Sequence, residues 1–315
     1  MSYKEIFKKV GFIILFTLIS IGSTSSVWSE ATKDIKKNFA STFTPLKETV
    51  LDESGFFSMS KMTKDLSALF PLAKRIGKDS QDLFDLYDIY ILVLSKKPEK
   101  SKELIKYGNE FFNNFKNNNL LTDRKRAWIH YRLTNAYQEE GDFPNGIKHQ
   151  KSFIAFALKS KLMPTEASSL GQKEQLAYLL HENEQYSEAL QVNLEVEKGA
   201  KKAQLAEDKY LNLYNNLAQN YYKLKHFSNA KVYLNKRLAL SQKYENFEVE
   251  LNTLFQLAVL AFEEDEFDKS KELFKKRIEL AKTKEELLEY STLEGMEEDL
   301  ATYYEKLDKK QKWSL

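Results

Sequence analysis

The side chains that most often carry chemistry are scarce or wrongly spaced in this sequence. It has no cysteine, which excludes disulfides, thiolate metal ligands and a cysteine nucleophile. His181 and Glu182 begin like the zinc-binding helix motif H-E-x-x-H, but Gln185 stands where the second histidine is needed. No glycine-rich phosphate loop, Walker sequence or G-x-S-x-G sequence occurs. The sequence therefore predicts no catalytic residue, no metal site and no cofactor.

Acidic runs and paired tyrosines are the remaining residues that suggest chemistry. Glu263-Glu264-Asp265 and Glu297-Glu298-Asp299 could contain a catalytic pair of carboxylates, although such runs are typical of a solvated surface. Tyr221-Tyr222 and Tyr303-Tyr304 could form a platform for a carbohydrate or a peptide. Since adjacent residues of a helix point in different directions, we expect one ring of each pair in the core and the other at the surface.

The elements that must position these residues repeat along the chain. From residue 128 onward an aromatic residue recurs at spacings of 43, 41 and 40 residues. A leucine followed by a small residue precedes each aromatic by ten and nine positions, and another small residue follows the aromatic by three. The four sets are Leu133, Thr134, Phe143 and Gly146; Leu176, Ala177, Tyr186 and Ala189; Leu217, Ala218, Phe227 and Ala230; and Leu257, Ala258, Phe267 and Ser270.

This pattern predicts pairs of amphipathic helices joined by short turns. The leucine anchors the first helix of a pair, the two small residues let the helices approach closely, and the aromatic fills the gap at the turn. No pair can bury its apolar face alone, so neighbouring pairs must stack. Only 10 glycines and 5 prolines occur in 315 residues, and this scarcity favours long helices over turns.

The segments that carry this pattern resemble the tetratricopeptide repeat. They are LTNAYQEEGDFPNGI, LAYLLHENEQYSEAL, LAQNYYKLKHFSNAK and LAVLAFEEDEFDKSK. The period exceeds the 34 residues of that repeat, which lengthens each helix by about a turn, and most units lack its final proline. The resemblance implies an all-α fold, an α-α superhelix or solenoid of antiparallel helix pairs.

The rest of the chain is less regular. Residues 30–58 mix Ser, Thr, Pro45 and Gly55 with scattered aromatics, and we expect a linker with at most one short helix. Helical periodicity begins near Ser60, which predicts degenerate helical repeats over 59–127 before the clear repeats of 128–290. Residues 291–315 restart a first helix without completing a pair, as a capping helix would.

Residues 1–29 have the three-part layout of a secretory signal peptide. Three lysines precede the apolar run Val10–Ile21, and small polar residues lead to a cleavage position before Glu30. The run is shorter than the roughly 20 residues that span a bilayer. We expect an exported protein, periplasmic or secreted, without stable membrane insertion after cleavage. The alternative is an anchor formed by the uncleaved segment.

The charge of the chain argues against a nucleic-acid partner. Its net charge is +2, and residues 1–29 contain three of the 48 basic and one of the 46 acidic residues, so 45 of each sign remain. Nucleic-acid binders usually carry a basic excess.

The resemblance places ligands on the concave face formed by the first helices of the pairs. Amides on that face can clamp an extended peptide, and aromatics supply contact area at a small entropic cost. The expected binding residues are Tyr131, Asn135, Gln138, Tyr178, His181, Asn215, Gln219, Tyr222, Phe255 and Phe262. Two alternatives remain: the C-terminal helix covers the stripe that contains Phe255 and Phe262, and His181 is a plain surface histidine rather than a pH-sensitive contact.

The function expected from the sequence is therefore a scaffold that binds a protein or peptide without catalysis. One alternative is a ligand-responsive sensor that acts through a separate chain. Another is an enzyme such as a cell-wall lyase, but no stretch of about 100 residues outside the repeats is left to hold a catalytic domain. The sequence does not decide whether the protein forms a homo-oligomer.

Overall fold

The computed structural model describes residues 25–52, 59–283, 288 and 292–313, so the predicted signal segment lies outside the described residues as far as residue 24. Every regular element in these ranges is helical. The chain divides into two compact modules, residues 1–120 and residues 121–315. Among the described helices, none is long and apolar enough to cross a membrane.

The first module is built around a buried aromatic cluster. Its helices are α2 (Ser25–Leu51), α3 (Met59–Ser67), α4 (Phe70–Ile76), α5 (Gln81–Leu94), the 3-10 turn η1 (Pro98–Lys100) and α6 (Ser101–Phe115). Phe70 lies 4.7 Å from the ring of Tyr87 and 5.3 Å from that of Tyr90. The two tyrosine hydroxyls donate hydrogen bonds to Glu110 and Glu103, so their polar ends are satisfied inside the core.

Helix α2 corrects the expectation of a linker over residues 30–58. The chain is helical from Ser25 to Leu51, with Pro45 inside the helix. Phe39, Phe43 and Val50 are buried along one stripe of α2, at the spacing of a helix face. Burial of this stripe within the first module outweighs the backbone hydrogen bond that Pro45 cannot make.

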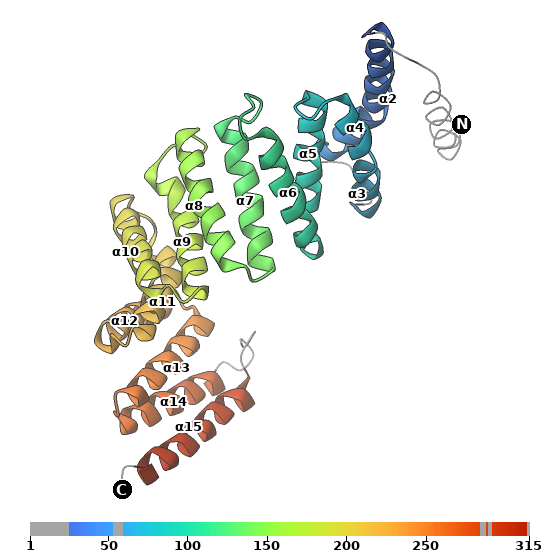
Figure 1. Ribbon diagram of the computed structural model, residues 1–315. Coiled ribbons are helices and arrows are strands. Elements are labelled where there is room, and N and C mark those ends of the chain that lie inside the picture. The colour runs from blue at the N-terminus through green and yellow to red at the C-terminus, as the bar shows by residue number, and fades with distance from the viewer. Residues whose placement is uncertain (1–24, 53–58, 284–287, 289–291, 314–315) are drawn as a thin grey trace. The chain divides into compact units, whose positions relative to one another are not determined.

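The second module consists of consecutive antiparallel helix pairs, each followed by the next along the chain (Figure 1). The first helix of each pair, the A helix, is α7 (Asp123–Glu139), α9 (Glu166–Glu182), α11 (Tyr210–Lys223) or α13 (Phe247–Glu263). The second, the B helix, is α8 (Phe143–Lys159), α10 (Tyr186–Lys202), α12 (Phe227–Lys243) or α14 (Phe267–Thr283). The 3-10 turn η2 (Glu207–Lys209) precedes α11, and α15 (Leu293–Trp313) follows the last pair.

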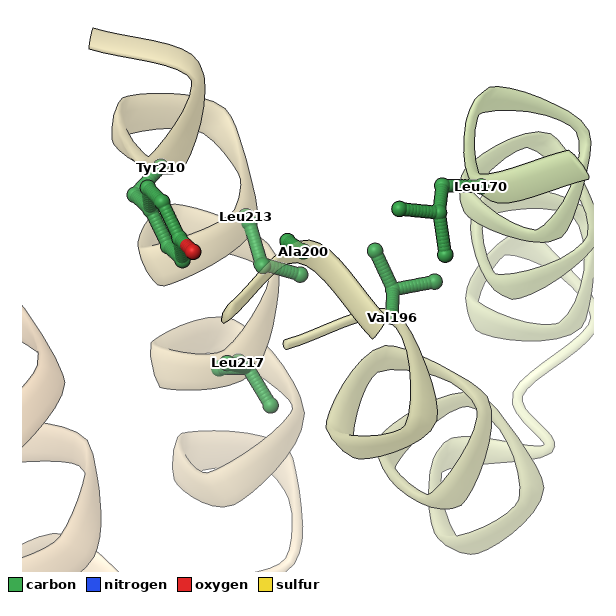
Figure 2. Close-up of a cluster of buried hydrophobic side chains, with 6 residues drawn as sticks. All are labelled: Leu170, Val196, Ala200, Tyr210, Leu213 and Leu217. Carbon is green, nitrogen blue, oxygen red and sulfur yellow. The ribbon is translucent and has the colours of Figure 1, made fainter. Parts of the chain in front are cut away.

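The repeat pattern predicted from the sequence is confirmed in these pairs. Each B helix begins at the turn aromatic. All four anchor leucines are buried, as are the small residues that follow them and the small residues in the B helices. The pairs also stack through shared cores. Figure 2 shows one of them, in which Leu170 of α9, Val196 of α10 and Leu213 of α11 belong to a single apolar cluster.

Each A helix ends in the same left-handed turn. Gly141, Glu184, Lys225 and Asp265 occupy equivalent places and have φ between 58° and 70°. The next backbone N–H closes the turn in each case, as when His226 N donates to Tyr221 O at 2.8 Å. Only the first of the four is glycine, so three repeats hold an ordinary residue where its Cβ is strained.

Candidate binding site between A helices

The ten predicted binding residues all lie on the A helices of the second module. Tyr178 is the most open of them, with 44% of its surface exposed, and the others are partly buried. The structure brings them together in slots between successive A helices, each slot formed by two A helices and the B helix that connects them. The slots differ in which side chains occupy them.

The slot between α7 and α9 is bridged by amides. Gln175 Nε2 donates to Asn135 Oδ1 at 3.0 Å and makes a longer contact of 3.5 Å with Gln138 Oε1. Asn135 and Gln138 were expected to be open to a peptide, but they connect two repeats. Gln175 escapes a sequence-based search because it lies one position before the anchor leucine.

The slot between α9 and α11 is bridged by a histidine. His181 Nδ1 lies 2.8 Å from Oδ1 of Asn220, which is 1% exposed, and the His181 ring packs 5.1 Å from Tyr186. His181 is thus neither a plain surface histidine nor a free binding group, because its polar end is used between repeats.

The slot between α13 and α15 is filled by an aromatic ring. Tyr303 of α15 packs 5.4 Å from Phe262 and 5.3 Å from Phe274, and its hydroxyl donates to Phe267 O at 2.7 Å. The alternative in which the C-terminal helix covers this stripe is confirmed for Phe262. Tyr303 is buried and Tyr304 is exposed, as expected for a tyrosine pair.

The slot between α11 and α13 contains a pocket of about 180 Å³. It is lined by Ala218, Gln219, Tyr222, Ala230, Leu234, Phe255, Gln256, Val259 and Leu260. Three predicted binding residues, Gln219, Tyr222 and Phe255, are among them. A fourth, Asn215, accepts a hydrogen bond from Gln256 Nε2 at 2.9 Å. Within the described residues, the Gln219 amide has no hydrogen-bond partner.

Two leucines explain why this slot is open. Leu234 of α12 is equivalent to Phe274 of α14, 40 residues later, and both follow their turn aromatic by seven positions. Leu260 of α13 is equivalent to Tyr303 of α15, 43 residues later. Both leucines are buried in one apolar cluster with Ala218 and Ala230. In the slot formed by α13, α14 and α15, the rings of Phe274 and Tyr303 fill the space. In the slot formed by α11, α12 and α13, the smaller leucines leave the equivalent space empty.

A buried arginine lies behind the pocket. Arg237 is 6% exposed, and its Nη1 donates to Asn252 Oδ1, Thr253 Oγ1 and Gln256 Oε1 at 2.9, 3.0 and 3.2 Å. Its Nε has no hydrogen-bond partner among the described residues, and burial lowers the pKa of the guanidinium to about 10. A buried cation surrounded by neutral groups is an unusual arrangement, because the charge lacks electrostatic compensation.

The equivalent arginine in the next repeat has a counter-ion. Arg277 Nη1 lies 2.6 Å from Asp299 Oδ2, and the guanidinium stacks 4.9 Å from the centre of the Phe255 ring. Asp299 is equivalent to Gln256, 43 residues earlier, just as Tyr303 is equivalent to Leu260. The pocket site is therefore a copy of the α14–α15 contact in which one carboxylate and two rings have been replaced.

Comparison with known proteins identifies the fold. No protein-family model matches the chain, and no curated protein matches it. Among solved structures, BtubC (BKLC) from P. vanneervenii is 17% identical with a TM-score of 0.50, and the match covers 70% of this chain and 86% of that one.

Two further structures are similar at lower scores. The nearly identical TPR-like repeats of a Podosopora anserina kinesin light chain are 15% identical, with a TM-score of 0.48 and coverage of 66% of this chain and 96% of that one. The apo form of RapI is 14% identical, with a TM-score of 0.49 and coverage of 82% and 75%. At these identities the likeness concerns the fold and not the function. Together with the internal repeat, the likeness to BtubC shows that this chain has the fold of tetratricopeptide-like repeat proteins, an α-α solenoid of antiparallel helix pairs.

Proposed function

We propose that the protein is a scaffold that binds a protein or a peptide through its A helices, with the α11/α13 pocket at the centre of the contact. The observation that carries this proposal is the combination of groups in the α11/α13 slot. Like the other slots it is bridged, here by Gln256 and Asn215, but beside this bridge lie an apolar pocket and the amide of Gln219, which has no hydrogen-bond partner among the described residues. Apolar walls with a few convergent polar groups are typical of binding sites.

A protein or peptide suits this site better than a nucleic acid or a cofactor. The balanced charge of residues 30–315 supplies no basic excess for phosphates. In the described part of the chain, no group of three or more His, Asp or Glu side chains is placed to hold a metal ion. The pocket is small and lies between α11 and α13, and the preceding A helix α9 presents the exposed Tyr178.

Site-specific photo-crosslinking tests the proposed site. A benzophenone amino acid at Gln219 should give a discrete crosslinked species in cells that express the protein, and mass spectrometry would identify the attached peptide. The matched control places the same group at Lys198, which is exposed on the B helix α10. Equal crosslinking from both positions, or none from Gln219, would contradict the proposal that this face binds a partner.

We further propose that the protein is exported, on the strength of the basic, apolar and small-residue segments of residues 1–29. N-terminal sequencing of the protein purified from its native cells is the direct test. A mature chain that begins near Glu30 is expected. An intact N-terminus in the envelope fraction would indicate the anchored alternative, and an intact N-terminus in the cytoplasm would refute export.

A further inference from the structure

We infer that the α11/α13 pocket receives one aromatic side chain of a peptide or protein partner, and that a carboxylate next to this ring is held at the Gln256 end of the pocket by Arg237. This inference rests on the proposed function, since it specifies the chemistry of the partner that the same site binds.

The dimensions of the pocket fit a single ring. Its volume is about 180 Å³. Sites for whole small molecules usually enclose roughly 300–1,000 Å³, whereas a cavity of about 150 Å³ in an apolar core accommodates benzene. Leu234, Val259 and Leu260 supply apolar walls, and Phe255 supplies an aromatic one. A ring of the size of phenylalanine or tyrosine therefore fills the space without displacing a helix.

The chain itself contains a template for such an occupant. In the neighbouring slot, α15 presents Asp299 and Tyr303 one helical turn apart. The carboxylate pairs with Arg277 and the ring packs on Phe262 and Phe274. The pocket has the equivalent arginine, Arg237, but Gln256 and Leu260 replace the carboxylate and the ring. Relative to its filled copy, the pocket lacks one negative charge and the ring of Tyr303, and Leu234 in place of Phe274 widens the space further.

Charge complementarity favours a carboxylate as the second group. No carboxylate in the described residues forms an ion pair with Arg237, so the buried guanidinium is compensated only by neutral oxygens. Gln256 lines the pocket and contacts Arg237, which places the arginine one side chain behind the pocket wall. A carboxylate that reaches Gln256 would supply the missing negative charge in surroundings where screening by water is weak.

Selection from a phage-displayed library of random dodecapeptides tests this inference on the full chain. We expect the enriched peptides to share an aromatic residue within four positions of Asp or Glu, which is the spacing of Asp299 and Tyr303. Leu260→Phe and Val259→Phe fill the pocket from two positions of α13 and should weaken binding of these peptides at least tenfold. Leu158→Phe, at an exposed leucine of the B helix α8, is the matched control and should leave their affinity unchanged. Circular dichroism identifies any variant that fails to fold.

A variant that keeps the pocket volume gives an independent readout. Gln256→Glu supplies Arg237 with an internal carboxylate, so it should raise the urea midpoint of unfolding and weaken binding of the acidic peptides at least tenfold. Enriched peptides without the paired aromatic and acidic residues, or peptides that bind the wild type and the folded pocket variants equally, would overturn the inference while leaving the proposed function intact. Failure to enrich any peptide would count against both.

Discussion

Acidification should loosen the first repeat of the second module through a buried pair of histidines. His130 Nδ1 lies 2.8 Å from His149 Nδ1, with His130 stacked on Phe156 and His149 stacked on Tyr137. Burial, together with nearby groups that include Lys148, lowers the pKa of His130 to about 3 and that of His149 to about 4. Both rings are therefore neutral in the folded protein at pH 5, whereas an unfolded histidine has a pKa of about 6.5.

The sign and size of the effect follow from proton linkage. Between pH 6.5 and about 4, the unfolded chain binds protons that the folded chain does not, so the free energy of unfolding falls as the pH falls. At pH 5 the loss is about 2 kcal/mol for each histidine and up to about 4 kcal/mol for the pair, from about 1.4 kcal/mol per pH unit. Each histidine then accounts for a roughly thirtyfold change in the local opening equilibrium.

Hydrogen exchange measures this change where it occurs. After correction for intrinsic rates, the protection factors of amides in α7 and α8 should drop by at least thirtyfold between pH 7 and pH 5. The double variant His130→Gln, His149→Gln retains a polar pair without a titrating group and should remove most of that drop. His226→Gln, at an exposed histidine, is the matched control and should not. An equal drop in the double variant and the wild type would refute the assignment to this pair.

Three further stability predictions concern the second module, and urea unfolding checks each of them. Asn193 is buried, its Oδ1 has no hydrogen-bond partner within the described residues, and the next repeat has Leu234 at this position. Asn193→Leu should therefore stabilise the protein by about 1–3 kcal/mol. A loss of stability would show that the amide has a structural role. Lys225 has φ of 61° and lies outside the core, so Lys225→Gly should relieve about 1 kcal/mol of backbone strain, and no gain would contradict the strain argument. Asp299→Ala should lower the free energy of unfolding by about 2 kcal/mol, because Arg277 of the α14–α15 contact would stay buried without its partner. Unchanged stability would mean that the ion pair contributes nothing to the free energy of unfolding.

The fold of the second module was predictable because its sequence signal lies in core positions. Leu217, Ala218 and Phe227, for example, have one packing role each, and that role recurs in every repeat. Helix α2 was not predictable in the same way. Pro45 and the Ser and Thr residues around it favour a loop locally, and the burial of Phe39 and Phe43 depends on elements that are distant in sequence.

The candidate site was predictable only in part. Spacing correctly places Gln219, Tyr222 and Phe255 on A helices, and the structure brings them together at one pocket. Spacing does not show that Asn135 is occupied by Gln175, because this depends on how two A helices align across a slot. Spacing does not identify the pocket either. The pocket arises from Leu234 and Leu260, whose positions in a regular repeat only pack against neighbouring helices.

Departures from the repeat therefore say more about function than the repeat does. The residue at a consensus position packs in the same way in every helix pair. Where one pair has a smaller or an uncharged residue at that position, an empty space or an uncompensated charge is left, and the fold itself does not use it. Leu260 and Gln256 are departures of this kind, one turn apart on α13. They leave a ring-sized space beside Arg237, which has no counter-ion in the part of the chain that the structure describes. If packing alone decided these positions, an aromatic and an acid would suit them better, as Tyr303 and Asp299 show in the next slot. The two departures coincide at one slot, which is the arrangement expected when a partner supplies both missing groups.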